Sequence, residues 1–321
     1  MKINNNNYRT LVESFFKYRH SSGINNPYEE NRLRLFVHYC ETIKPDSCEI
    51  TQEMIDRWSM KRDSETAVSR NARICILVAF LRYLNKHLSY NYIIPERIKN
   101  SKSNYIPHSF TEEELAQFFE QCDNLPKIKG IQMSIKRLVV PTFFRLLYST
   151  GMRPIEARLL LRKDVNIEEG FIRINESKGG NQHYVALHHS MISILKKYDI
   201  SINKIQPDRK FFFESSSGNP FNTRWVIRTF HQVWNKANGN KEYVIPYDLR
   251  HHYAITNINR WQNDGFDFNE KMLFLSKSMG HSSIEATLYY YSLVPRLAST
   301  IRKNTEKEFN NIVPEIDYEN K

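Results

Sequence analysis

Two short segments of alternating hydrophobicity interrupt a chain whose other regular patterns are helical. They span residues 171–174 and 183–187, and such alternation is typical of half-buried strands. Gly179 and Gly180 lie in the connection between them, as a hairpin requires. Residues 1–100 read as entirely helical, and helical patterns return after Asn222. The sequence therefore predicts a mainly α fold with a small antiparallel β-sheet.

The length of the chain favours two domains, because 321 residues exceed one typical domain. We expect a helical N-terminal domain over residues 1–100, a polar linker over 101–108 and a second, mainly α domain over 109–321. The second domain should begin with a helix, since Thr111-Glu112-Glu113-Glu114 forms a capping box before an apolar-periodic stretch. A helix at 138–148, rich in large apolar residues, should lie in its core.

The charge balance of the chain favours a polyanionic partner. Lys and Arg outnumber Asp and Glu by 46 to 35, a formal charge of +11, which favours nucleic acid before a membrane surface. The clearest helix of the first domain, at 70–84, has a polar face that is either solvated or in contact with DNA. Its apolar face carries Ile74, Leu77, Leu81 and Leu84. The candidate DNA contacts on the polar face are Arg70, Asn71 and Arg73.

Several classes of protein are disfavoured by what the sequence lacks. The N-terminus has no apolar segment typical of a secretion signal, and no apolar run approaches the roughly 20 residues of a membrane span. The cysteines have no C-x-x-C spacing, which disfavours zinc and a disulfide framework; they are Cys40, Cys48, Cys75 and Cys122. We expect a cytoplasmic protein with reduced thiols and no metal.

A possible nucleophile lies near the C-terminus. His281 follows Gly280 and precedes Tyr289, Tyr290 and Tyr291 by eight to ten residues. A tyrosine hydroxyl can attack phosphorus, and imidazole is a suitable group beside the attacked phosphate. Three adjacent aromatic residues also pack well in an ordinary helix, so the stretch alone leaves both interpretations open.

Upstream residues favour the chemical interpretation. Cleavage of a phosphodiester without a metal requires positive charge on the non-bridging oxygens and a proton donor for the leaving oxygen. Arg153 and Arg250 suit the first task, because the guanidinium fork matches phosphate oxygens. Lys178, at the predicted hairpin turn, could supply the proton if neighbouring charges lower its pKa. Each alone could be an ordinary surface residue, and the order Arg, Lys, Arg, His, Tyr strengthens them together.

These residues lie in motifs that resemble those of the tyrosine recombinases, the lambda-integrase and Xer-like family. Thr150-Gly151-Met152-Arg153-Pro154-Ile155-Glu156 is similar to the first arginine box, and residues 177–187 are similar to the lysine hairpin. Asp248-Leu249-Arg250-His251 resembles the second arginine box, and the stretch from Gly280-His281 to Tyr290 resembles the last. The family's spacing of nine residues from histidine to nucleophile selects Tyr290, and Thr287 also matches.

The resemblance implies a site-specific DNA recombinase that needs neither metal, ATP nor another cofactor. Tyr290 would attack a DNA phosphate, forming a 3′-phosphotyrosyl link and freeing a 5′-hydroxyl. Arg153 and Arg250 would stabilise the transition state, and Lys178 would protonate the leaving oxygen. Glu156 would hold the arginine region in place. Residues 1–100 would be the core-binding domain and residues 109–321 the catalytic domain.

One position departs from the family pattern. The second box usually begins with histidine, and this chain has Tyr247 there. Because a free tyrosine has a pKa near 10, it is a poor base at neutral pH. We therefore predict a positional role for Tyr247, with His281, water or the phosphate removing the proton. His251 and His252 should face different sides of a helix, and we interpret both as structural.

The resemblance also implies partners. We expect double-stranded DNA bound by a homotetramer, with accessory proteins that set direction, in phage integration, transposition or chromosome-dimer resolution. Residues 294–312 could form a helix that packs on its own chain or docks on a neighbouring protomer; its apolar residues include Leu297, Ile301 and Phe309. Alternatives are a type IB topoisomerase-like enzyme, a non-catalytic DNA-binding protein and a structural module, although the last leaves the ordered motifs unexplained.

Overall fold

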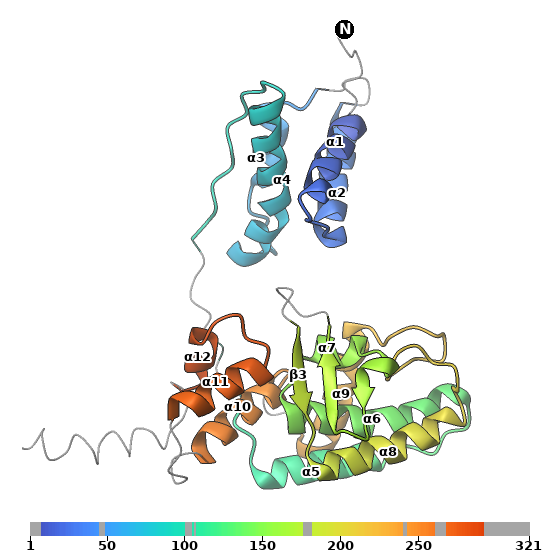
Figure 1. The fold of residues 1–321 in the computed structure, drawn as a ribbon. Coiled ribbons are helices and arrows are strands. Elements are labelled where there is room, and N and C mark those ends of the chain that lie inside the picture. The colour runs from blue at the N-terminus through green and yellow to red at the C-terminus, as the bar shows by residue number, and fades with distance from the viewer. Residues whose placement is uncertain are drawn as a thin grey trace, which may run out of the picture. The chain divides into compact units, whose positions relative to one another are not determined.

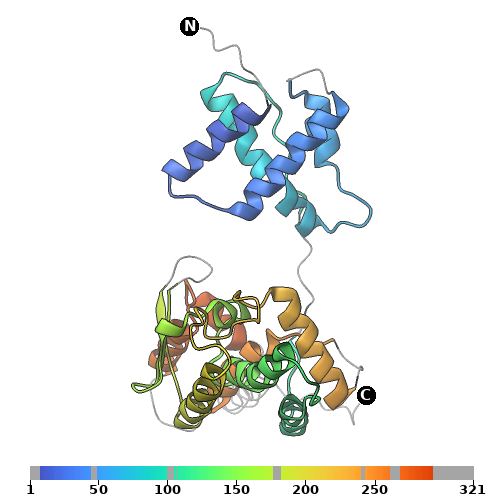
Figure 2. The same ribbon diagram turned by 90° about the vertical axis from the view of Figure 1, so that its right-hand side faces the viewer.

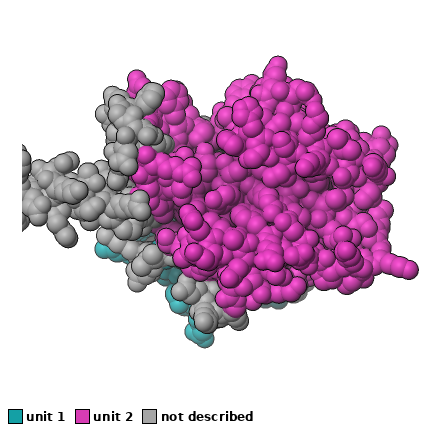
Figure 3. All heavy atoms as spheres, turned by 90° about the horizontal axis from the view of Figure 1, so that it is seen from below, with its two compact units in different colours: residues 1–105 teal, residues 106–321 magenta. Residues whose placement is uncertain are grey.

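The computed structural model describes residues 8–44, 49–99, 105, 107–175, 182–239, 243–260 and 268–291. The chain divides into two compact units, residues 1–105 and 106–321, which are coloured separately in Figure 3. The division falls inside the predicted linker.

Within its described residues, the regular elements of the first unit are all helices, joined by loops (Figure 1). Its helices are α1 (Tyr8–Ser21), α2 (Pro27–Ile43), α3 (Gln52–Ser59) and α4 (Ala67–His87). Asn26, Thr51 and Thr66 begin α2, α3 and α4, because their side chains accept hydrogen bonds from backbone N–H groups of the first turn. Phe15, Phe36 and other large apolar side chains fill one core between the helices.

The apolar face predicted for α4 is confirmed. Ile74, Leu77, Leu81 and Leu84 are each at most 1% exposed. The opposite face differs from the expectation, because Arg70 is also buried, at 7% exposure. The prediction of an exposed basic face was wrong for this residue.

The larger part of the second unit combines helices with a small sheet around an aromatic-rich core. The predicted capping box begins α5: Thr111 Oγ1 accepts from the Glu114 N–H at 3.1 Å, and a Glu114 carboxylate oxygen accepts from the Thr111 N–H at 2.9 Å. The helices are α5 (Glu112–Asp123), α6 (Ile131–Thr150), α7 (Pro154–Leu159), the 3-10 turn η1 (Arg162–Asp164), α8 (His189–Asn203) and α9 (Thr223–Asn238). The core helix predicted at 138–148 lies within α6.

The described sheet has the antiparallel order β1-β2-β3, with strands Val165–Asn166, Phe171–Ile174 and His183–Ala186. The pairing of β2 with β3 confirms the predicted hairpin, and Ile172 faces Val185 in register. Both side chains are buried in the core, which fixes which face of the hairpin points inward. In Figure 2 the hairpin lies on the left of this unit, with α9 in gold on the right.

The last helices of the second unit have a small core of their own. They are α10 (Asp248–Arg260), α11 (Phe268–Ser278) and α12 (Glu285–Tyr291), and Met272, Leu275, Met279 and Tyr290 are buried among them. This group packs beside β3 and α6 (Figure 1). The predicted class, mainly α with a small antiparallel sheet, is confirmed. None of the described helices has the length and apolarity needed to cross a membrane.

Candidate active site

The junction between α6 and α7 places the first arginine. Gly151 ends α6 in the left-handed region at φ 63°, and a Cβ on it would lie 2.3 Å from a ring carbon of Tyr253, so the turn requires glycine. Arg153 then precedes Pro154 at the start of α7. A Glu156 carboxylate oxygen accepts from the Arg153 backbone N–H at 2.8 Å. The sharp turn therefore sets the direction in which Arg153 leaves the backbone.

Two partners hold the Arg153 guanidinium. Its Nη1 donates to Glu156 Oε1 at 2.6 Å, and its Nη2 donates to the Gly280 carbonyl at 2.9 Å. The Glu156 side chain is fully buried, which makes this ion pair a close and water-poor contact. This geometry matches the supporting role predicted for Glu156, because it fixes the arginine in place.

Arg250 ties three distant segments together. It lies in the first turn of α10 and is 1% exposed. Its Nη1 donates to the Gly151 carbonyl and its Nη2 to the Met279 carbonyl, each at 2.7 Å. Nη2 also lies 2.9 Å from His281 Nε2. A single guanidinium thus joins the α6–α7 turn, α10 and the segment before α12.

These contacts determine the tautomer of His281. Because arginine only donates, Nε2 must accept from Arg250, and Nδ1 therefore carries the hydrogen. Nδ1 lies 2.6 Å from Thr287 Oγ1, whose residue is fully buried, so the imidazole donates there. Burial, followed by the charges of Arg250 and Arg153, lowers the pKa of His281 from 6.5 to about 4. The ring is neutral at pH 7 and both nitrogens are engaged.

Tyr290 points into this cluster, whereas its neighbour Tyr289 faces solvent. Tyr290 is 3% exposed and Tyr289 is 46% exposed. The Tyr290 ring stacks on His281, with centroids 6.0 Å apart and planes 13° apart. Burial raises the pKa of Tyr290, and the Arg250 charge offsets part of that rise. Tyr290, which the family spacing selects, therefore lies among the arginine and histidine side chains, whereas Tyr289 does not.

The structure adds a residue that the sequence analysis interpreted as structural. The His251 ring contacts Tyr290 at 5.4 Å and Tyr247 at 5.0 Å between centroids. Its Nδ1 is buried without a hydrogen-bond partner. The available signal was the four-residue step from Tyr247 to His251, which places both on one side of a helix. His252 does face elsewhere and stacks on Tyr148.

Comparison with known proteins accords with this geometry. Residues 108–295 match the phage integrase family. The chain belongs to this family. It is 29% identical to tyrosine recombinase XerA of Pyrococcus furiosus over 288 residues, which cover 87% of this chain and 88% of the relative. It is 27% identical to a putative integrase/recombinase, y4rE, of Sinorhizobium fredii over 283 residues, covering 87% and 89%. The protein is a tyrosine recombinase and therefore an enzyme.

A solved structure supports the fold alone. The recombinase resembles the XerH site-specific recombinase, bound to a palindromic difH substrate in a post-cleavage complex. The TM-score is 0.60 at 21% identity, covering 92% of this chain and 84% of that chain.

Of the six predicted catalytic positions in the recombinase, five lie in the described residues and gather at one place. They are Arg153, Tyr247, Arg250, His281 and Tyr290. The sixth, Lys178, lies outside the described residues, as do residues 294–312 of the predicted docking helix. Within the described residues, no group of three or more His, Cys, Asp or Glu side chains could hold a metal.

The three candidate DNA contacts on α4 have partners inside their own unit. Arg70 Nε donates to the Ser59 carbonyl at 2.8 Å, and Asn71 exchanges two hydrogen bonds with the backbone of Ile98. Arg73 forms an ion pair with Glu65 at 2.6 Å. These side chains connect α4 to the α3–α4 loop and to the segment before the linker. The geometry of these three side chains supports a structural role. It gives no support to contact with DNA, which stays a prediction.

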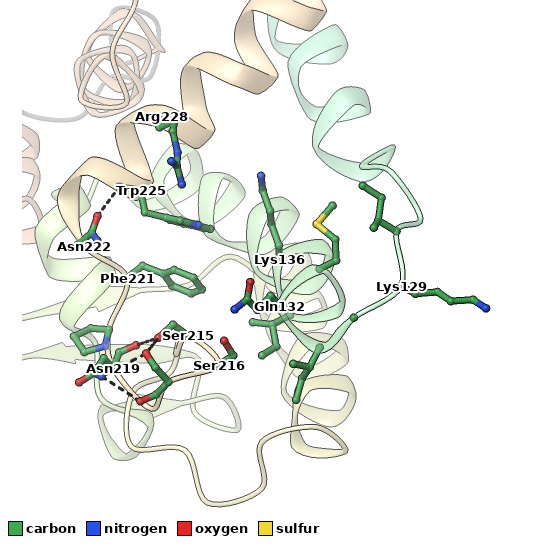
Figure 4. Close-up of a pocket in the computed structure, with 17 residues that line it drawn as sticks. Lys129, Gln132, Lys136, Ser215, Ser216, Asn219, Phe221, Asn222, Trp225 and Arg228 are labelled. Atoms are coloured by element: carbon green, nitrogen blue, oxygen red, sulfur yellow. Dashed lines mark hydrogen bonds between the residues drawn. The ribbon is translucent and has the colours of Figure 1, made fainter.

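A separate cavity of about 890 Å³ shares no residue with the catalytic cluster (Figure 4). It lies between the start of α6, the loop before α9 and α9 itself. The rings of Phe221 and Trp225 stack in its wall at 3.9 Å, and Lys136 and Arg228 stand beside them. Burial and the Arg228 charge lower the pKa of Lys136.

Proposed function

We propose that this recombinase cuts and rejoins DNA strands at a specific site through a 3′-phosphotyrosyl bond to Tyr290. The observation that carries the proposal is the convergence of two arginines and a histidine on one buried tyrosine. Arg153 and Arg250 come from segments far apart in the chain, yet both donate to carbonyls beside His281. Fixed donors of this kind stabilise the charge that develops on phosphate oxygens.

The proposed reaction exchanges one phosphodiester for another. The Tyr290 oxygen bonds to phosphorus, the bond to the 5′ oxygen breaks, and that oxygen leaves as a hydroxyl after protonation by Lys178. A 5′-hydroxyl from a partner strand then attacks the phosphotyrosine and gives its proton to Lys178, which had lost one in the first step. The bond between phosphorus and the Tyr290 oxygen breaks, and Tyr290 is released as a protonated phenol. Because each step conserves the number of ester bonds, the exchange needs no ATP, and the arginines supply the charge that a metal would otherwise provide.

Duplex DNA is the proposed substrate. The XerH structure named above is described as bound to a palindromic difH substrate, and a structure of the Tn1549 transposon integrase is described as a complex with transposon right end DNA. The formal charge of +11 suits a polyanion. We propose that residues 1–105 and 106–321 both contact the duplex and that the active assembly is a tetramer on DNA. In that assembly residues 294–312 would dock on a neighbouring protomer, and accessory proteins would set direction.

The test first finds the site and then traps the adduct. The Tyr290→Phe protein selects its site from a random duplex library, because it binds without cutting. A duplex carrying the selected site, nicked beside the cleavage position, then loses the released fragment and holds the covalent complex. Wild type with EDTA and without ATP should give an adduct on denaturing gels, and Tyr290→Phe should give none.

The solvent-facing Tyr289 provides a matched control. Tyr289→Phe should form the adduct at close to the wild-type rate. An adduct in Tyr290→Phe, or its loss in Tyr289→Phe alone, would contradict the assignment of the nucleophile. Strand exchange between two selected sites supports a recombinase, whereas relaxation of a plasmid without exchange would support the topoisomerase-like alternative.

A further inference from the structure

The nucleophile requires a group that removes its proton. A phenol has a pKa near 10, and burial raises that of Tyr290 further. Tyr290 is therefore protonated at neutral pH, and its attack on phosphorus requires the proton to leave. Any acceptor must lie next to Tyr290.

Most of the groups around Tyr290 cannot accept that proton. Arg153 and Arg250 are cations that only donate. His281 Nε2 accepts from Arg250, and its Nδ1 carries the hydrogen that faces Thr287. Tyr247 is another phenol, so its neutral form is a weak base. These groups can hold or polarise the phosphate or a neighbouring side chain, but none of them has a basic nitrogen that is available to accept the Tyr290 proton.

His251 differs from all of them. It is 9% exposed, its ring contacts that of Tyr290, and its Nδ1 is buried with no hydrogen-bond partner. A buried polar atom without a partner is costly, and a catalytic role is one of the physical reasons for which a folded protein keeps such an atom. The helix position is fixed, because the His251 N–H donates to the Tyr247 carbonyl at 3.3 Å.

We propose that His251 accepts the phenolic proton of Tyr290 when that tyrosine attacks DNA. The proposal rests on the proposed function. As the oxygen–phosphorus bond forms, the proton moves from the Tyr290 oxygen to the imidazole, which becomes an imidazolium. When a 5′-hydroxyl later attacks the phosphotyrosine, the imidazolium returns the proton to the departing Tyr290 oxygen. The net proton balance at His251 over the two steps is zero.

The groups around His251 keep its imidazole neutral, so that it can accept a proton. The titratable groups that face it are Tyr247 and Arg250 from its own segment and Tyr290 from α12. Burial, and then the Arg250 charge, lowers the pKa of His251 from 6.5 to about 4, so the ring is neutral at pH 7. Tyr247 packs edge-on against the ring at 65° and restricts its orientation. Tyr247 is thus a positioning residue for His251.

The experiment measures adduct formation on the nicked duplex at saturating DNA. His251→Ala and His251→Asn should lower the rate constant by about 10²- to 10⁴-fold, the range for general base catalysis, with DNA affinity changed less than about threefold. Added imidazole should partly restore His251→Ala, and the restored rate should follow the free-base form of imidazole as pH changes. His252→Ala is the matched control and should keep the wild-type rate, because His252 is a half-buried neighbour on the same helix that stacks on Tyr148.

A second substrate separates the two proton transfers. A sulfur in place of the bridging 5′ oxygen makes a leaving group that needs no proton, so it should restore Lys178→Ala but leave His251→Ala slow. The inference is overturned if the His251 variants cut within about threefold of wild type. It is also overturned if sulfur restores them or if imidazole does not. Failure of wild type to form any adduct would instead overturn the proposed function.

Discussion

Both units bury arginines against backbone carbonyls, but the two groups meet different neighbours. In the first unit Arg70 donates to the Ser59 carbonyl and Arg73 pairs with Glu65. In the second, Arg250 donates to the carbonyls of Gly151 and Met279. Arg250 also contacts the His281 ring nitrogen and lies over the Tyr247 ring. Burial of a guanidinium therefore does not by itself mark a site.

The two groups of arginines differ in the side chains that surround them. Arg70 and Arg73 bond to groups at most 26 residues away, which are backbone carbonyls, one side-chain amide oxygen and one carboxylate. Arg250 joins segments 99 and 29 residues away and stands beside a nucleophile candidate and two imidazoles. We infer that the first group stabilises its unit, whereas the second also takes part in the reaction. Four predictions test this distinction, from the largest effect to the smallest.

Arg250→Lys should nearly abolish adduct formation. A lysine cannot reproduce the planar fork that reaches two carbonyls and His281, and loss of one fixed donor to a transition-state oxyanion costs about 10²- to 10³-fold in rate. The measurement is the single-turnover rate on the nicked duplex, with circular dichroism to check folding. Arg145→Lys is the control, since Arg145 on α6 pairs with the half-exposed Asp123 at the end of α5. Equal rates for both variants would contradict a special role for Arg250.

Arg70→Met should lower stability without changing the chemistry. The substitution keeps an apolar stem but leaves the Ser59 carbonyl without its donor, which costs roughly 1–3 kcal/mol. The free energy of unfolding, from urea denaturation, should fall by that amount, and the adduct rate of the folded protein should stay within about twofold. A large loss of DNA binding with unchanged stability would instead restore Arg70 as a DNA contact.

Thr287→Val should slow adduct formation by about tenfold, equivalent to roughly 1.4 kcal/mol. Valine keeps the shape of threonine but removes the oxygen that receives the His281 Nδ1 hydrogen. The imidazole can then change tautomer and no longer presents Nε2 reliably to Arg250. Rate measurements on the nicked duplex test this, and Thr287→Ser, which keeps the hydroxyl, should retain most of the activity.

Acid should destabilise the second unit. His251 and His281 each have a pKa near 4 when folded, below the ordinary 6.5. Below pH 6.5 the unfolded chain therefore binds protons that the folded chain does not. Their contribution to stability is complete above pH 6.5 and is lost as the pH falls toward 4. Urea denaturation from pH 7 to 4.5 should show a shallower slope for His251→Asn, and an unchanged slope would contradict the buried neutral ring.

Some structural features of this protein can be predicted from the spacing of residues in the sequence alone. The capping box at Thr111, the apolar face of α4 and the strands on both sides of Gly179 and Gly180 each depend on residues a few positions apart. Hydrogen bonding and periodicity act within one element, so local sequence determines them. The order of the arginine, histidine and tyrosine motifs likewise indicated the family, and the family's nine-residue spacing from His281 then pointed to Tyr290.

Other features depended on which element covers a given face. The sequence placed Arg70 on a polar face of α4 but could not show that the chain around Ser59 and Glu96 covers it. It placed His251 one helical turn after Tyr247 but not beside Tyr290, because that contact needs α12 to pack on α10. The tautomer of His281 likewise follows from Arg250 and Thr287 meeting at one ring. Sequence determined the elements and the reacting groups, and tertiary packing decided their neighbours, because contacts across elements have no fixed spacing in the chain.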